Sequence, residues 1–278
     1  MKYKKRMKKI SIFIIAIMGL IVFCIWQNND IVITDYEYKN TKIPPEFNNY
    51  KILHISDLHN KEFGKDQSRL IKYTKEISPD IIVITGDLID CSHSNIEVSL
   101  DYIREAVKIS PIYFVSGNHE KSSGVYESLS EKLESYGVII LDNKNLTLQQ
   151  NDSSINLIGL SDITFMDSNE TLVSESLHEL VDNHSFNLLL SHRPEFMDVY
   201  TDNQVDLALV GHAHGGQVRL PFVGGLIAPN QGLFPAYTSG IHYNENTSMI
   251  ISRGLGNSIL PLRIFNRPEL VVITLKNS

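Results

Sequence analysis

The sequence predicts an α/β fold in which two packed β-sheets carry helices on their outer faces, preceded by an apolar helix near the N-terminus. Three observations lead to this prediction. Short apolar runs recur along the chain, and each ends in a polar or glycine-containing tip, as strands buried on both faces do. Helical patterns of roughly 10 to 15 residues lie between these runs, which favours a layered α/β architecture. An uncharged segment stands apart at the start of the chain.

The composition is that of a globular protein. Of the 278 residues, 42% are hydrophobic, 21% are charged and two are cysteines, which excludes a disordered chain and a disulfide-rich scaffold. The first nine residues contain six basic side chains and no acid, so the rest of the chain has 19 basic against 32 acidic residues, a net charge of −13. Because so acidic a body repels phosphate backbones, we expect no nucleic-acid partner.

The segment from Ile10 to Trp26 has 17 uncharged residues and reaches the lower limit for crossing a bilayer. A cleaved signal peptide and a buried core helix are the alternatives, but no small-residue cleavage site follows the segment. We therefore predict an uncleaved single-pass transmembrane anchor at residues 10–26. The basic residues 1–9 would lie in the cytoplasm and the rest of the chain on the outer face of a bacterial cell membrane.

Residues 27–48 are interpreted as a linker that runs into a first strand, and residues 49–278 as one domain. Within it, strands with their tips are predicted from the apolar runs at residues 51–59, 80–90, 112–120, 155–162, 186–195 and 207–216. Helical spacing of apolar residues appears between them at residues 70–77, 100–107, 129–136 and 172–180. Two further strand-like runs, at residues 249–254 and 269–275, close the chain.

The strand tips carry side chains of the types that bind metals. In open α/β sheets ligands bind beyond the carboxyl ends of the strands, so we expect these tips to converge although they are far apart in sequence. Carboxylates, imidazoles and one carboxamide, without a thiolate, suit ions such as Mn, Fe or Zn. Seven ligands are too many for one ion and suit two ions that share a carboxylate, as in phosphoryl-transfer sites. The predicted ligands are Asp57, His59, Asp87, Asn118, His192, His212 and His214.

The motifs DxH, GDxxD, GNHE, a lone His and GHxH follow one another in this order between about Lys51 and Gln217. In this the chain resembles the calcineurin-like metallophosphoesterase superfamily. The resemblance implies a four-layer αββα sandwich and hydrolysis by a metal-activated hydroxide. It also implies two ligand sets bridged by Asp87. They are Asp57, His59 and His214 on one ion and Asn118, His192 and His212 on the other.

The same resemblance implies two further roles. His119 would act in catalysis by stabilising or protonating the leaving oxygen, and Asp90, the last acid of GDxxD, would support the metal loops. The family often continues with Arg after this acid, whereas this chain has Cys91.

The N-terminal segment, together with GHAHGGQVRLPFVGGLIAP and SRGLGNSILPLRIFNRPEL, is similar to the membrane-associated subgroup grouped with UDP-2,3-diacylglucosamine hydrolases. Those enzymes cleave a pyrophosphate bond in a nucleotide-linked lipid. We therefore expect a membrane-anchored phosphoesterase or pyrophosphatase for a lipid-linked or cell-envelope substrate. A phosphatase or phosphodiesterase for soluble nucleotides or phosphoproteins is one alternative, and a catalytically silent binding scaffold is another.

Two other features leave alternatives open. The apolar residues 220–237 either form a lipid-facing lip beside the site or pack across the edge of the sandwich. Arg193, next to His192, is a candidate phosphate ligand, and an ordinary salt bridge is the other interpretation.

Overall fold

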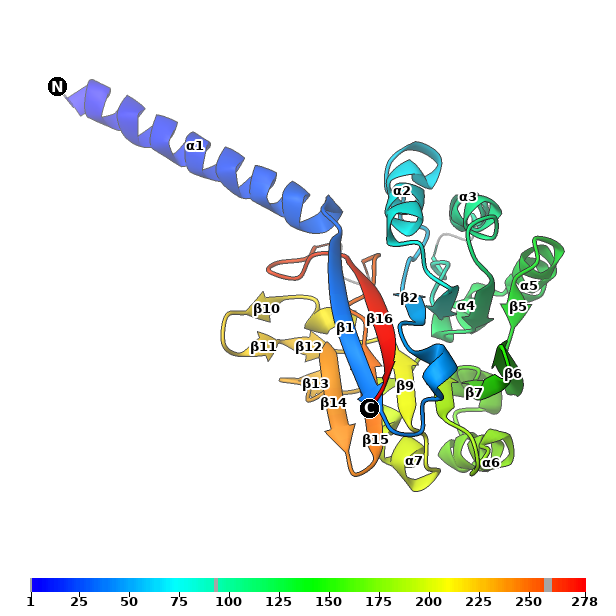
Figure 1. Cartoon of the computed structure of the whole chain (residues 1–278). Coiled ribbons are helices and arrows are strands. Elements are labelled where there is room, and N and C mark those ends of the chain that lie inside the picture. The colour runs from blue at the N-terminus through cyan, green and yellow to red at the C-terminus, as the bar shows by residue number, and fades with distance from the viewer. Residues whose placement is uncertain (1, 93–94, 258–261) are drawn as a thin grey trace.

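The computed structural model describes residues 2–92, 95–257 and 262–278. Its body contains two six-stranded sheets packed face to face (Figure 1). In the first sheet β2, β3, β4 and β5 run parallel, and the C-terminal strand β16 pairs antiparallel with β2 and parallel with β1. The strand order is β1 (Val32–Asn40), β16 (Glu269–Asn277), β2 (Lys51–Ile55), β3 (Ile81–Thr85), β4 (Ile112–Val115) and β5 (Ile139–Ile140).

The second sheet is also mixed, but its antiparallel pairs lie at the edges. Strands β7, β8, β9 and β15 are parallel, and antiparallel strands close both edges. The order is β14 (Gly240–Asn244), β15 (Thr247–Ile251), β9 (Leu207–Val210), β8 (Asn187–Leu190), β7 (Ser153–Gly159) and β6 (Lys144–Gln150). Two small hairpins follow β9, formed by β10 (Arg219–Leu220) with β11 (Gly224–Gly225) and by β12 (Ile227–Ala228) with β13 (Gly232–Leu233).

Helices cover the outer face of each sheet (Figure 1). The first sheet carries α2 (Ser68–Ile77), α3 (Glu97–Ala106) and α5 (Tyr126–Ser135), and the second carries α6 (Glu170–Leu180) and α7 (Met197–Asp202). The short helix α4 (Asn118–Ser123) follows β4 directly, and short 3₁₀ turns include η3 (Ile163–Met166) and η4 (Pro194–Phe196).

Three apolar clusters separate these four layers. Alternate residues of one strand enter different clusters, because successive side chains point to opposite faces of a sheet. In β3, Ile82 and Ile84 pack under the helices, whereas Ile81 and Val83 pack between the two sheets. A third cluster, with Leu177 and Tyr200, lies between the second sheet and its helices. The predicted αββα sandwich is therefore confirmed, and the continuous apolar runs are explained by strands that are buried on both faces.

The N-terminal helix α1 (Lys2–Asn29) projects from the body (Figure 1). The segment Tyr3–Asn29 is long and apolar enough to cross a membrane, and almost none of it is buried. Its last turn is different, because Gln27 is only 3% exposed and its Oε1 accepts a hydrogen bond from the backbone N–H of Asn266. Asn28 Oδ1 accepts another, 3.0 Å long, from the N–H of Arg263. The end of the helix is thus fixed to the body.

This attachment corrects the interpretation of residues 27–48 as a linker. Residues 27–29 belong to α1, and Val32–Asn40 forms β1, which pairs with β16 along its whole length. Tyr38 in β1 is buried, and its hydroxyl donates a hydrogen bond to the carbonyl oxygen of Asp206, which immediately precedes β9 of the second sheet. The first sheet therefore begins well before residue 49.

We predict that a chain beginning at Asn49 will not unfold cooperatively, whereas one beginning at Asp30 will. Each buried apolar side chain stabilises a fold by about 1.5–3 kcal/mol, and a domain has only about 5–15 kcal/mol in total. Urea unfolding followed by circular dichroism tests this, and equal midpoints for the two chains would contradict it. The shorter chain lacks four buried side chains, Ile31, Tyr38, Ile43 and Phe47.

Candidate metal centre

The predicted ligands follow the carboxyl ends of five parallel strands from the two sheets. Because the sheets pack with these ends on the same side of the molecule, residues far apart in sequence meet there. Asp57 and His59 follow β2, Asp87 follows β3, and Asn118 follows β4; His192 follows β8, and His212 and His214 follow β9.

The first ligand group consists of Asp57, His59, Asp87 and His214, whose ligand atoms all lie within 4.8 Å of one another. The Nε2 atoms of His59 and His214 are 3.1 Å apart. His214 Nε2 is 3.3 Å from Asp57 Oδ1, and His59 Nε2 is 3.6 Å from Asp87 Oδ2. All four residues are buried.

The second ligand group consists of Asp87, His192 and His212. His192 Nε2 is 3.2 Å from Asp87 Oδ2 and 3.1 Å from His212 Nδ1. One oxygen, Asp87 Oδ2, thus lies close to imidazole nitrogens of both groups. This is the arrangement that a bridging carboxylate requires.

These residues fit two divalent ions. Two ligands at roughly 2.1 Å from one ion lie roughly 3.0 to 3.4 Å apart, which is the spacing of the facing imidazole nitrogens. Within the described part of the chain, Asp87 Oδ2 and Asn118 Oδ1 are also buried without a hydrogen bond. Buried oxygen acceptors normally have partners, so these two atoms are suited to a cation. The assignment of each ligand to one ion stays a prediction.

The backbone is unusual at this site. Asp57, His59, Asp87, His212 and His214 all have φ between 47° and 64°, the left-handed region that residues other than glycine rarely adopt. Such conformations cost about 1–3 kcal/mol each and are typical of functional sites. Five strained residues in one cluster therefore indicate a site whose geometry is maintained at the expense of stability.

Glycines allow the ligand loops to approach one another this closely, because a side chain at these positions would clash with a neighbouring loop. A Cβ atom on Gly117 would lie 2.3 Å from Asp87 Oδ1, and one on Gly211 would lie 1.8 Å from Ser56 Oγ and 2.5 Å from Asp57 Oδ2. The glycines of the GNHE and GHxH motifs are therefore required where two ligand loops touch each other.

Asp90 lies behind His59 as seen from the first ligand group. Its Oδ2 is 3.6 Å from His59 Nδ1, and this interaction lowers the pKa of the Asp90 carboxyl well below its usual value. An ionised Asp90 favours the proton on Nδ1 and leaves the lone pair of Nε2 pointing into the site. This geometry supports the predicted role of Asp90 in positioning a metal loop.

His119 is the second residue of the short helix α4 and packs edge-on against His59. The backbone N–H of Cys91 donates a hydrogen bond to its Nδ1 over 3.1 Å. The proton of a neutral ring must then sit on Nε2, which lies 4.0 Å from Asp87 Oδ2. Burial lowers the pKa of His119, which also favours the neutral ring. Cys91 thus contributes a main-chain contact at the position where the family often has Arg.

Sequence reasoning missed Glu120, the last residue of GNHE. Its buried carboxylate accepts hydrogen bonds from the backbone N–H groups of Asp87, Leu88, Ile89 and Gly117, at 2.7 to 3.2 Å. Burial and the nearby Asp87 carboxylate raise the pKa of Glu120 to about 7, while the four donors favour its ionised form. Glu120 therefore determines the path of the loop that carries the shared ligand. A glutamate in the first turn of a helix gives no other sign of this role.

Asp162, at the tip after β7, was also missed. It receives two hydrogen bonds from Arg193, from Nε at 2.5 Å and from Nη2 at 3.0 Å. Both side chains are buried. Arg193 Nη1 lies 2.9 Å from His212 Nε2. Arg193 therefore forms a salt bridge with Asp162, and the same guanidinium group contacts His212 of the second ligand group.

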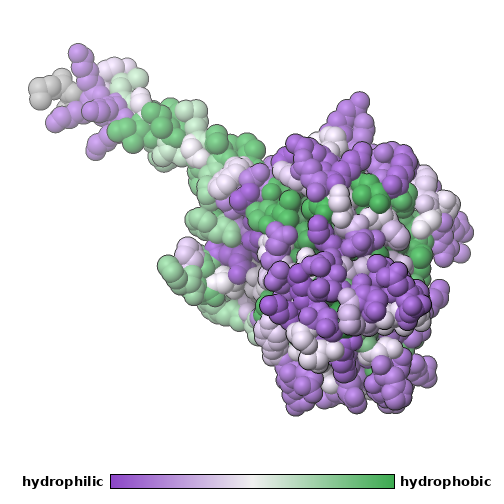
Figure 2. All heavy atoms as spheres, viewed as in Figure 1, coloured by the Kyte–Doolittle hydropathy of each residue, from purple (hydrophilic) through white to green (hydrophobic). Residues whose placement is uncertain are grey.

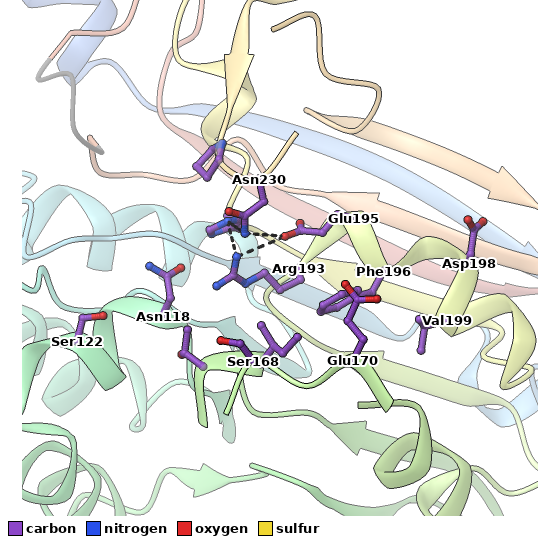
Figure 3. A pocket seen from close by; sticks show the side chains of 14 residues that line it. Asn118, Ser122, Ser168, Glu170, Arg193, Glu195, Phe196, Asp198, Val199 and Asn230 are labelled. Atoms are coloured by element: carbon purple, nitrogen blue, oxygen red, sulfur yellow. Dashed lines mark hydrogen bonds and ion pairs between the residues drawn. The ribbon is translucent and has the colours of Figure 1, made fainter. Parts of the chain in front are cut away.

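A pocket of about 790 Å³ opens beside the second ligand group. Figure 3 shows Arg193 with Glu195 and Asn230 on one side and Asn118 on the other, and all four residues line the pocket. Farther out the wall is mainly polar and includes the carboxylates of Glu170 and Asp198. Such a pocket suits a polar group better than an acyl chain.

The amino-acid sequence is similar to those of known phosphoesterases. The sequence pattern described as calcineurin-like phosphoesterase matches residues 50–216. The chain is 33% identical over 253 residues to the uncharacterized metallophosphoesterase YkuE of Bacillus subtilis, covering 88% of this chain and 85% of that protein. It is 29% identical to the phosphodiesterase YaeI of Escherichia coli, covering 81% of this chain and 82% of that protein. It is 25% identical to a transmembrane protein with metallophosphoesterase domain of Danio rerio, covering 88% of this chain and 57% of that protein.

We predict that Glu120→Gln will weaken Mn²⁺ binding by about 10- to 100-fold, the usual cost of losing a residue that orients ligands. The amide would turn an N–H group toward backbone donors and disturb the loop of Asp87. Isothermal titration of the metal-free protein measures the effect. Glu127→Gln, on the exposed side of α5, is the matched control, and equal affinities in the two variants would contradict the prediction.

Proposed function

The chain belongs to the calcineurin-like phosphoesterase family, whose members use two divalent metal ions. We propose that it is a membrane-anchored enzyme that hydrolyses phosphate esters or pyrophosphates at the cell surface. That it is a metal-dependent phosphoester hydrolase follows from the family and from the clustered ligands. The single observation that carries the proposed mechanism is that Asp87 Oδ2 lies within reach of both ligand groups.

The proposed ligands of one ion are Asp57, His59 and His214, those of the other are Asn118, His192 and His212, and Asp87 joins the two. Mn, Fe and Zn all suit these donors. When bound, the pair of ions supplies Lewis acidity and makes a water molecule a nucleophile near neutral pH. The protein's part is to fix its ligands before the substrate arrives, and the strained loop backbones and Glu120 do this.

His119 is the group that we assign to the leaving oxygen. Its Nδ1 accepts the N–H of Cys91, so its Nε2–H is free to donate a hydrogen bond into the site. A donor held in this way stabilises the negative charge that develops on the departing oxygen. Arg193 lines the pocket next to His212, where it can contact a phosphoryl oxygen or a polar group of the substrate.

The membrane part of the proposal has separate support. The helix α1 is long and apolar enough to span a bilayer, and basic residues flank only its N-terminal end. By the charge rule this end is cytoplasmic and the catalytic body is on the outer face. A relative is named as a transmembrane protein with this kind of domain. A lipid-linked or cell-envelope substrate, such as the nucleotide-linked lipid of UDP-2,3-diacylglucosamine hydrolases, would be held near such an anchor.

One observation favours a second candidate, a phosphodiesterase or phosphatase for soluble substrates. The pocket beside the metal centre is mainly polar and could hold a soluble nucleotide or a phosphorylated side chain. The two candidates differ in what they require of the membrane. Only the first predicts faster turnover of a lipid-dispersed phosphodiester than of its soluble headgroup analogue.

The main test is metal-dependent hydrolysis by the full chain in detergent. We expect the metal-free protein to be inactive on bis-p-nitrophenyl phosphate and p-nitrophenyl phosphate, and added Mn²⁺ to restore turnover. Asp87→Asn should abolish this turnover, because it removes the carboxylate between the two ligand groups. Bound metal without turnover on either substrate or on the lipid substrate would instead identify a silent scaffold.

His119→Ala should retain the metal and slow turnover by about 10²- to 10⁴-fold, the usual worth of a group that assists proton transfer. His119→Gln is the informative companion, because an amide N–H can replace part of the hydrogen bond to the leaving oxygen. Metal content by mass spectrometry and kcat on both substrates separate binding from chemistry. Wild-type kcat in the alanine variant would overturn the assignment.

A further inference from the structure

We propose that exposed apolar side chains of the hairpins β10–β11 and β12–β13 insert into the membrane leaflet next to α1. The hairpin surface is defined by six exposed apolar side chains, Leu220, Phe222, Val223, Ile227, Leu233 and Phe234. The inference rests on the anchoring of α1 in the proposed function and adds a second contact with the bilayer. It also decides between the two interpretations of residues 220–237, in favour of a lipid-facing lip.

The hairpin surface is unusually apolar for a part of the body that faces solvent. Phe222 is fully exposed, and Leu233 and Phe234 are 72% and 69% exposed. From Leu220 to Tyr237 the sequence contains no Asp, Glu, Lys, Arg or His. A contiguous apolar surface without charges marks a contact site and can enter a bilayer without the cost of burying an ion.

The backbone supports a role for these side chains outside the fold. Phe222 and Phe234 have φ of 67° and 54°, a conformation that is costly for bulky residues. Both lie beside hairpin strands, and neither packs into an apolar cluster of the body. The backbone strain at these two residues exposes their rings and adds no packing contacts to the folded body. Insertion of the rings into lipid would bury their apolar surface and offset the cost of the strain.

The hairpin surface has a fixed position relative to α1. The ring of Phe23 in α1 packs on that of Phe265, with centroids 5.5 Å apart, and Arg267 lies over the ring of Trp26. The same loop holds β10, because the N–H of Arg219 donates a hydrogen bond to the carbonyl oxygen of Ile264 over 3.0 Å. The helix, the loop of residues 262–267 and the first hairpin therefore form one connected unit.

The pictures place this unit on one flank of the body. The hairpins project on the side toward which α1 runs, and apolar residues appear on that flank beneath the helix (Figures 1 and 2). Trp26, at the end of the apolar segment, is of the residue type that favours the level of the lipid headgroups. A bilayer crossed by α1 would thus meet the hairpin surface at its outer face.

The opposite side of the hairpins borders the metal centre. Pro229 and Asn230, between β12 and β13, line the pocket, and Asn230 Nδ2 donates a hydrogen bond to Glu195 Oε1 over 3.0 Å. The pocket would therefore open beside the leaflet. A lipid headgroup could enter the polar pocket while its chains stayed in the bilayer.

The test uses fluorescent probes on the full chain in nanodiscs. In a Cys24→Ser, Cys91→Ser background, single cysteines are introduced as Phe222→Cys and Phe234→Cys and labelled with an environment-sensitive dye. Ile14→Cys in α1 reports the anchor, and Tyr243→Cys, an exposed position on β14, is the control. Brominated lipids quench a dye in the bilayer, and iodide quenches one in water.

We expect brominated lipids to quench the dyes at positions 222 and 234 by about half or more, as at position 14, and iodide to quench the dye at position 243. Iodide quenching at 222 and 234 with lipid quenching at 14 would overturn the hairpin inference alone. Protection at 222 and 234 from both quenchers would also overturn it and would indicate a protein contact. Iodide quenching at position 14 would refute the membrane anchor itself, and the inference with it.

A kinetic experiment supplies an independent readout. The double variant Phe222→Ser, Phe234→Ser should lower turnover of a phosphodiester lipid in vesicles by about 10-fold, because the pocket would no longer be held against the leaflet. Its turnover of soluble bis-p-nitrophenyl phosphate should be unchanged. The matched control, Leu172→Ser with Tyr243→Ser, removes two other exposed apolar side chains. Equal loss in both pairs, or loss on the soluble substrate, would overturn the inference.

Discussion

The carboxylate of Asp87 is the group on which the rest of the site depends. Its Oδ2 lies between the imidazoles of His59 and His192, and its Oδ1 accepts a hydrogen bond from the backbone N–H of His119. Its own N–H donates to Glu120. A single loop after β3 thus joins the two ligand groups to the residue that we assign to the leaving oxygen. The close approach of Gly117 to this carboxylate shows how tightly that loop is held.

The αββα sandwich could be predicted from sequence because its central strands are buried on both faces. All five residues of β3 are buried and apolar or β-branched, and an acidic tip follows at once, so both the strand and its functional end are visible in the sequence. The same holds for β9 and the histidines that follow it. For these elements local pattern and tertiary position agree, and the ligand loops were found with them.

Other features depend on partners that a local pattern does not contain. Strand β1 alternates polar and apolar residues and belongs to the sheet only because β16, from the other end of the chain, pairs with it. Glu120 and Asp162 are ordinary acids until their partners, four backbone N–H groups and Arg193, are seen in space. The roles of such residues arise from contacts across the fold, and no spacing in the sequence specifies them.

The attachment of α1 has a consequence for how the enzyme would meet its substrate. The backbone N–H of Asn266 donates a hydrogen bond to Gln27 Oε1, and the side-chain amide of Asn266 donates hydrogen bonds to the carbonyl oxygens of His214 and Gln217. One residue therefore connects the helix to a ligand loop, with no flexible tether between them. If α1 spans the bilayer as proposed, the active site travels in a thin layer at constant height, and its encounters become a two-dimensional search. Turnover would then depend on how many substrate molecules occupy each unit of membrane area rather than on their bulk concentration.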